Sequence, residues 1–198
     1  MFSIRNHWSI PLGILLLAQT VLGQAEFVPD KMEGSIFPVV KTDQSIAEVI
    51  ASTPEFDRFH ELLSQSTSLF SLLDEGGSWT VMVPTNAAFR ELNQKARLGI
   101  AMSHIILDKF LNWHISDEWI TPEHIKMSGI YTIWSYNHQF NLYIHCDSKN
   151  QIKMRNIPAV IGIQAKNGMI YAFDHMTIYP DILNELNLGK FPVKFESE

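Results

Sequence analysis

The stretch that decides the fold reads Thr80-Val81-Met82-Val83-Pro84-Thr85-Asn86-Ala87-Ala88-Phe89. Its apolar first half predicts a strand over residues 79–83, because β-branched and aromatic side chains favour strands. Pro84 has no N–H to donate and marks the place where the strand leaves its sheet. The hydroxyl of Thr85 can accept from the free amides of the next turn, so we expect a capped helix over residues 86–92.

The segment before this strand predicts short helices. Ser45 and Glu48 have the spacing of a capping box, which predicts a helix over residues 46–51. Thr53-Pro54-Glu55 opens a second helix, because proline is tolerated in a first helical turn. Three more helical segments are predicted: residues 69–73, residues 102–111 and a turn that opens at Thr121-Pro122.

From residue 130 onwards the apolar residues alternate with a period of two, which is typical of strands. Asn167-Gly168 marks a tight turn, and Pro180-Asp181 is expected to open a closing helix. Helices first and strands afterwards predict an α+β domain. The strands are expected at residues 130–136, 139–146, 151–155, 159–165 and 169–178.

Three motifs, in order along the chain, resemble the landmarks of fasciclin (FAS1) domains. Residues 80–89 are similar to the first family signature, and residues 167–175 are similar to the last. Between them, residues 107–115 resemble the helix that ends in the family's Tyr-His pair. The resemblance covers about residues 42–180. It implies a FAS1-type wedge-shaped β-sandwich with several short helices packed around it, and a binding or adhesion module that is not an enzyme.

Departures from the family pattern limit what the resemblance implies. Trp113 stands in the tyrosine position of the Tyr-His pair, and Tyr171 stands where a histidine is often found. Some matrix-associated members are credited with integrin binding through an Asp-Ile pair before the Asn-Gly turn. This chain has Gly162-Ile163 at the matching position, so integrin binding is not supported.

The first 23 residues predict a signal peptide. Arg5 precedes an apolar stretch over residues 10–22, and the small residue Gly23 follows it. This stretch is shorter than the roughly 20 residues that cross a bilayer. We therefore expect entry into the secretory pathway and a mature chain without a stable membrane anchor.

The rest of the chain divides into three parts. Residues 24–40 mix prolines, a glycine and charges without a period, and predict a linker or N-terminal arm. We assign the FAS1 domain to residues 41–186 and a charged C-terminal tail to residues 187–198. The expected address is the outside of the cell, the cell wall or the lumen of a vacuole.

Charge argues against one class of partner. The chain has 15 Lys and Arg residues against 21 Asp and Glu residues, a formal net charge of −6, and no run of basic residues. A nucleic-acid-binding surface needs clustered cations to neutralise phosphates. We therefore expect no nucleic acid among the partners.

The eight histidines form no recognised metal-binding motif, because no His-x-x-x-His, Cys-x-x-Cys or His-Glu-x-x-His spacing occurs. The sequence also lacks a nucleophile elbow and a phosphate-binding glycine loop. We expect no catalytic residue, metal or cofactor. The one cysteine, Cys146, cannot form a disulfide within the chain, and the alternation of residues 140–146 predicts a buried free thiol.

Trp113, His114 and Tyr143 are the candidate binding residues. His114 ends a predicted helix. The negative end of the helix dipole could stabilise a positive charge on its ring, or the ring could form a hydrogen bond that locks the following strand. Phe140, Leu142 and Ile144 are expected to face inward, so Tyr143 faces outward. Exposed aromatic side chains are common anchors for protein and carbohydrate partners.

Two functions stay open. The first is an interaction protein that binds another protein or a wall or matrix polymer. The alternative is a vacuole-lumen FAS1 protein with an enzymatic or small-molecule-binding role, which would need a deep pocket with converging polar groups.

Overall fold

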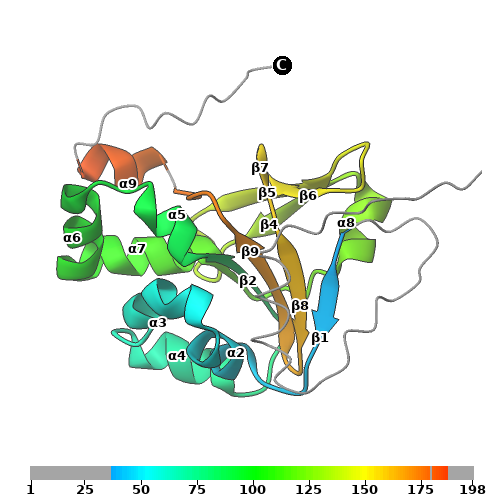
Figure 1. Ribbon diagram of the computed structural model, residues 1–198, viewed down its shortest axis with the longest axis horizontal. Coiled ribbons are helices and arrows are strands. Elements are labelled where there is room, and N and C mark those ends of the chain that lie inside the picture. Colours follow the sequence, from blue (N-terminus) through cyan, green and yellow to red (C-terminus); the bar gives the residue numbers. More distant parts are fainter. Residues whose placement is uncertain (1–36, 179, 187–198) are drawn as a thin grey trace, which may run out of the picture.

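The structure is a computed structural model that describes residues 37–178 and 180–186. Most of its helices cover one side of a mixed sheet, whereas α8 lies beside the small sheet (Figure 1). In chain order the helices are α2 Ile46–Ser52, the 3₁₀ turn η1 Pro54–Phe56, α3 Asp57–Leu63, α4 Thr67–Asp74, α5 Asn86–Arg90, α6 Gln94–Met102, α7 His104–His114, α8 Pro122–Ser128 and α9 Pro180–Glu185.

The strands form two sheets. The large sheet has the order β1-β8-β9-β2-β3 and the small sheet the order β4-β5-β6-β7. The large sheet contains β1 Val39–Lys41, β8 Ile161–Ala165, β9 Gly168–Phe173, β2 Trp79–Pro84 and β3 Ile115–Ser116. The small sheet contains β4 Ile130–Trp134, β5 Asn141–Cys146, β6 Ile152–Met154 and β7 Ile157–Pro158.

Strand β2 lies inside the large sheet and is buried along its whole length. It pairs in parallel with β9, with Val81 opposite Ile170. Val81 and Val83 pack into the cluster that contains the helix side chains, whereas Met82 packs into the cluster that contains the small sheet. Alternate side chains of one strand thus hold together the helices on one face and the small sheet on the other.

The sequence reading is confirmed for the α+β class, for the strand at residues 79–83 and for the Thr85 cap, whose hydroxyl accepts from the Ala87 N–H at 3.2 Å. It is wrong for helix α6 and for the end of the last strand. Helix α6 was not predicted, because only Ala96 and Ile100 are buried along it. The strand predicted to reach residue 178 ends at Phe173, because side chains take over the hydrogen bonding there: the Glu91 carboxylate accepts the Met176 N–H at 2.9 Å.

Regular structure begins inside the segment predicted as an arm. Strand β1 pairs in parallel with β8, and the Pro38 carbonyl accepts the Gly162 N–H at 2.9 Å. The buried Phe37 ring lies 6.1 Å from the Tyr171 ring, centroid to centroid. Residues 37–40 therefore belong to the domain. Their partner strand lies across the sheet, and no local pattern in the sequence reveals it.

The predicted signal peptide and C-terminal tail lie outside the described residues. Across residues 37–178 and 180–186, no helix has the length and apolarity to cross a membrane.

Candidate functional site

Trp113 lies at the end of α7, with only 1% of its surface exposed. Its ring packs edge-on against Phe140 at 5.7 Å between centroids, and the Arg155 guanidinium lies 5.2 Å from the ring centroid. The side chain therefore joins α7 to the small sheet. Trp113 is therefore a core residue in this structure, because the small sheet covers this side of α7.

His114 is fully buried beside the rings of Phe110 and Phe59. Its Nδ1 lies 2.6 Å from the Phe110 carbonyl oxygen, and its Nε2 lies 3.2 Å from the Thr177 hydroxyl oxygen. A carbonyl only accepts, so Nδ1 carries the proton and Nε2 accepts from Thr177. Burial lowers the pKa of His114 to about 4, so the ring is neutral at pH 7. His114 thus forms hydrogen bonds, but to α7 itself and to the segment after β9, and not to the strand that follows the helix.

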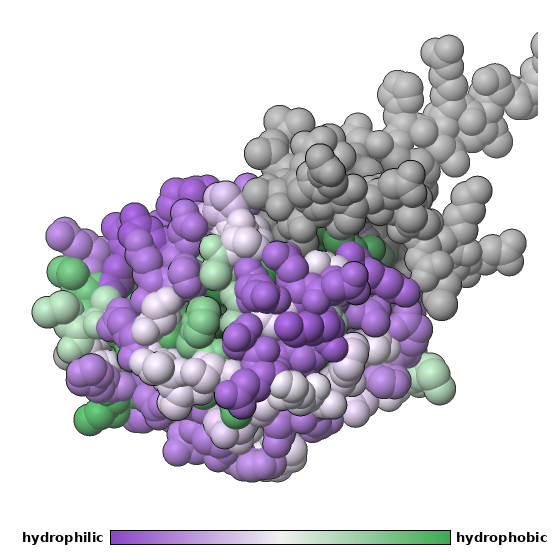
Figure 2. Space-filling view, turned by 90° about the horizontal axis from the view of Figure 1, so that it is seen from below, coloured by the Kyte–Doolittle hydropathy of each residue, from purple (hydrophilic) through white to green (hydrophobic). Residues whose placement is uncertain are grey.

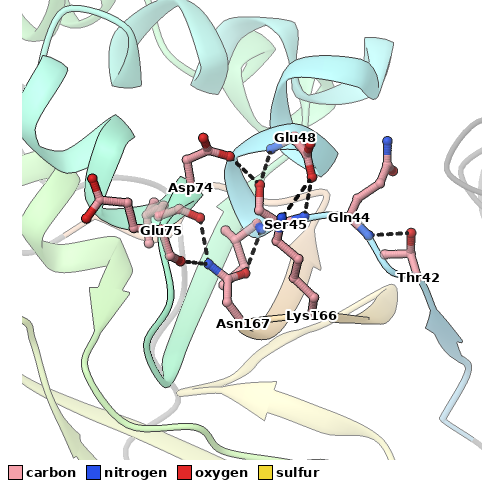
Figure 3. Close-up of polar contacts among 10 residues, drawn as sticks. Thr42, Gln44, Ser45, Glu48, Asp74, Glu75, Lys166 and Asn167 are labelled. Atoms are coloured by element: carbon pink, nitrogen blue, oxygen red, sulfur yellow. Dashed lines mark hydrogen bonds and ion pairs between the residues drawn. The ribbon is translucent and has the colours of Figure 1, made fainter.

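A second buried polar group, which the sequence reading interpreted only as a turn, is Asn167 (Figure 3). Its side-chain oxygen accepts the Ile46 N–H at 2.9 Å, and its Nδ2 donates to the carbonyls of Leu73 and Glu75 at 2.8 and 2.7 Å. One amide therefore connects the start of α2, the end of α4 and the turn between β8 and β9. The only signal in the sequence was the Asn-Gly pair itself.

The polar side chains around Asn167 also form hydrogen bonds with one another. Ser45 forms the predicted capping box with Glu48, and its hydroxyl donates to the Asp74 carboxylate at 2.7 Å. Gly168 follows with a φ of +155°, and a Cβ there would lie 2.0 Å from the Trp79 carbonyl oxygen. This arrangement leaves no polar group of the Asn167 side chain for a ligand, so it is a structural junction.

Asp174 and His175 form separate contacts. Asp174 accepts from the Thr85 hydroxyl at 2.8 Å, whereas Nδ1 of His175 lies 2.5 Å from the Glu91 carboxylate. Within the part of the chain that the structure describes, no three His, Cys, Asp or Glu side chains gather in a way that could hold a metal ion.

Cys146 is half-buried, so the prediction of a fully buried thiol is wrong at the last residue of β5. Desolvation raises the pKa of the thiol, and the nearby Lys126 lowers it by a smaller amount. The thiol is therefore protonated at neutral pH, which makes it a poor nucleophile.

Tyr143 is 47% exposed and lies on the outer face of the small sheet, as the alternation predicts. Directly opposite on β4 is Thr132, and the next outward pair is Trp134 with Asn141. Trp134 is 44% exposed, and its ring lies 6.2 Å from that of His138. The third outward pair is Ile130 with the half-buried His145. We call the outward residues of these two strands the small-sheet face: Ile130, Thr132, Trp134, Asn141, Tyr143 and His145.

Comparison with known proteins finds a protein family and a solved structure that are similar to this chain. The fasciclin domain model matches residues 54–179. Among solved structures, a FAS1 domain pair from the insect cell adhesion molecule fasciclin I is similar, with a TM-score of 0.57 and 13% identity. The match covers 70% of this chain and 52% of that chain, so this chain spans about half the length of the solved pair. At this identity the likeness concerns the fold, which is FAS1-type as the sequence implied.

No curated protein matches the sequence. The family model nevertheless covers more than half of the 198 residues, with both signature stretches inside the match. The chain therefore belongs to the fasciclin domain family.

Proposed function

We propose that this chain is a non-enzymatic fasciclin module of the secretory pathway that binds a protein or a wall or matrix polymer through the small-sheet face. The observation that carries the proposal is the exposure of Trp134 and Tyr143 on neighbouring strands of that face. Large aromatic side chains bring contact area at little cost in side-chain entropy, which is why they dominate binding surfaces.

The composition of the small-sheet face supports binding to an uncharged or weakly charged surface. None of its six residues is Asp, Glu, Lys or Arg, and Thr132, Asn141 and His145 add hydrogen-bonding groups beside the two aromatic rings. Depletion of charge and enrichment of aromatic residues are typical of the centre of an interface.

The backing of the face makes it rigid. Ile133, Leu142 and Ile144 point inward from the same strands and are at most 1% exposed. Trp134 and Tyr143 thus lie on strands that are held in place by buried side chains, so little conformational entropy is lost in these strands when a partner binds. The fold also favours adhesion, because the similar solved structure belongs to a cell adhesion molecule.

Binding to lipid-free wall or matrix extract tests the proposal. We expect Trp134→Ala and Tyr143→Ala each to weaken binding by about tenfold or more, because each removes an exposed aromatic anchor. Leu98→Ala is the matched control, since Leu98 is 53% exposed and lies on α6, far from the small sheet. Equal binding by wild type and both aromatic variants would overturn the assignment of this face.

A further inference from the structure

A second group of exposed apolar side chains lies at the turn between α6 and α7. Leu98, Met102 and Ile105 are 53%, 80% and 69% exposed. Leu98 and Met102 lie four residues apart on one face of α6, and Ile105 lies in the first turn of α7, just after the extended residue Ser103 that separates the two helices. Figure 2 shows green side chains gathered at the end of the molecule where α6 and the first turn of α7 lie. We call these three residues the helical-tip patch.

The fold does not need the helical-tip patch for its own packing. Helix α6 turns Ala96 and Ile100 into the core, and α7 turns Leu107 inward. On α6, Gly99 allows Leu186 to approach closely, because a Cβ at Gly99 would lie 2.2 Å from the Leu186 Cδ2 atom. Both helices therefore meet their packing requirements away from the three exposed side chains.

Basic side chains lie beside the patch. Lys95 is exposed one turn before Leu98, and Arg97 is exposed next to it. Neither forms an ion pair within residues 37–178 and 180–186, whereas Lys109 on α7 pairs with Glu185. One carboxylate, Asp108, is exposed near Ile105. The local balance is thus positive on a chain whose formal net charge is −6.

We propose that the helical-tip patch is a peripheral contact with a lipid bilayer surface. Leu98, Met102 and Ile105 would enter the boundary between headgroups and acyl chains, while Lys95 and Arg97 face anionic headgroups. Aliphatic side chains have no hydrogen-bonding groups that would need a partner at a fixed position. They therefore suit a bilayer, into which apolar groups can be buried without a specific geometry. The cations Lys95 and Arg97 next to them add attraction to anionic lipid.

The proposal concerns a different face from the one assigned to adhesion and is independent of it. Three side chains bury little area, and the negative charge of the rest of the chain opposes approach to an anionic surface. The contact is therefore weak, reversible and sensitive to salt.

Co-sedimentation of the mature chain with vesicles tests the contact, using phosphatidylcholine alone and phosphatidylcholine with a minority of phosphatidylserine. We expect stronger binding to the vesicles that contain phosphatidylserine. Met102→Glu should lower the bound fraction about tenfold, since it places a charge where the proposal has an apolar side chain entering the bilayer. The double substitution Lys95→Ala with Arg97→Ala should reduce binding to the level seen with phosphatidylcholine alone.

Met127→Glu is the matched control, because Met127 is equally exposed, at 86%, but lies on α8. It should bind vesicles like wild type, and thermal melting should show that both glutamate variants stay folded. Absence of sedimentation with either vesicle would overturn the proposal, and so would equal loss in the Met102 and Met127 variants. Vesicle binding that persists in Met102→Glu would show that another surface is responsible.

Discussion

At the scale of single residues, His114 carries the clearest consequence of burial. The neutral ring joins the Phe110 carbonyl on α7 to the Thr177 hydroxyl, which lies beyond the end of β9. Its pKa is about 4 in the folded chain against an ordinary value of 6.5. Below pH 6.5 the unfolded chain therefore binds a proton that the folded chain does not.

We expect the free energy of unfolding to fall as the pH falls from about 6.5 towards 4, because stability increases with pH wherever the unfolded state binds more protons. One such proton corresponds to about 1.4 kcal/mol per pH unit and about 3 kcal/mol across the whole window. Urea unfolding at pH 7 and pH 5 measures the slope. Glu48 and Asp147, whose pKa values are lowered, add their own losses only below about pH 4.5.

His114→Gln provides the control for this slope. The variant should be less stable than wild type at pH 7, yet lose less stability between pH 7 and pH 5, since it has no imidazole to protonate. An unchanged slope would assign the pH dependence to other groups. Loss of partner binding at unchanged stability would instead make His114 a functional residue.

The candidate residues show what alternation and helical spacing can predict. Tyr143 was placed correctly, because every second residue of β5 faces the core. Trp113 and His114, the other two candidates, are both buried, since α7 packs against helices on one side and the small sheet on the other. Periodicity identifies one buried face of a helix, but a second buried face appears only when the distant strands fold against it.

At the scale of elements, the Asn167 junction explains why the Asn-Gly turn matters for the fold. Its side chain is 4% exposed and fulfils one acceptor and two donor contacts on α2 and α4. The sequence predicted the turn but not the partners, which lie 92 to 121 residues away along the chain. Contacts over such separations leave no local period.

We expect Asn167→Asp to destabilise the protein by about 3 kcal/mol or more, because the carboxylate can still accept from Ile46 but cannot donate to two buried carbonyls. Chemical denaturation at pH 7 measures the change. Asn141→Asp is the matched control, because Asn141 is exposed on β5 and should change stability by less than about 0.5 kcal/mol. Similar losses in the two variants would contradict the junction.

At the scale of the whole molecule, the N-terminal edge of the large sheet is where the sequence reading and the structure disagree most. Composition marked residues 24–40 as an arm, because prolines and charges interrupt any period. In the structure, β1 closes that edge by pairing with β8, and Val40 is 3% exposed. A strand of three residues is too short to show alternation, so its partner decides its structure.

We therefore expect a chain that begins at Thr42 to be less stable than one that begins at residue 24, by about 3 kcal/mol. The shorter chain loses the burial of Phe37 and Val40, each of which contributes about 1.5–3 kcal/mol when fully buried. Urea unfolding of both chains measures the difference, and a chain that begins at Phe37 is the control that separates the contribution of residues 37–41 from that of residues 24–36. Equal stability of all three chains would mean that β1 only covers the edge, and the domain would then begin at Thr42.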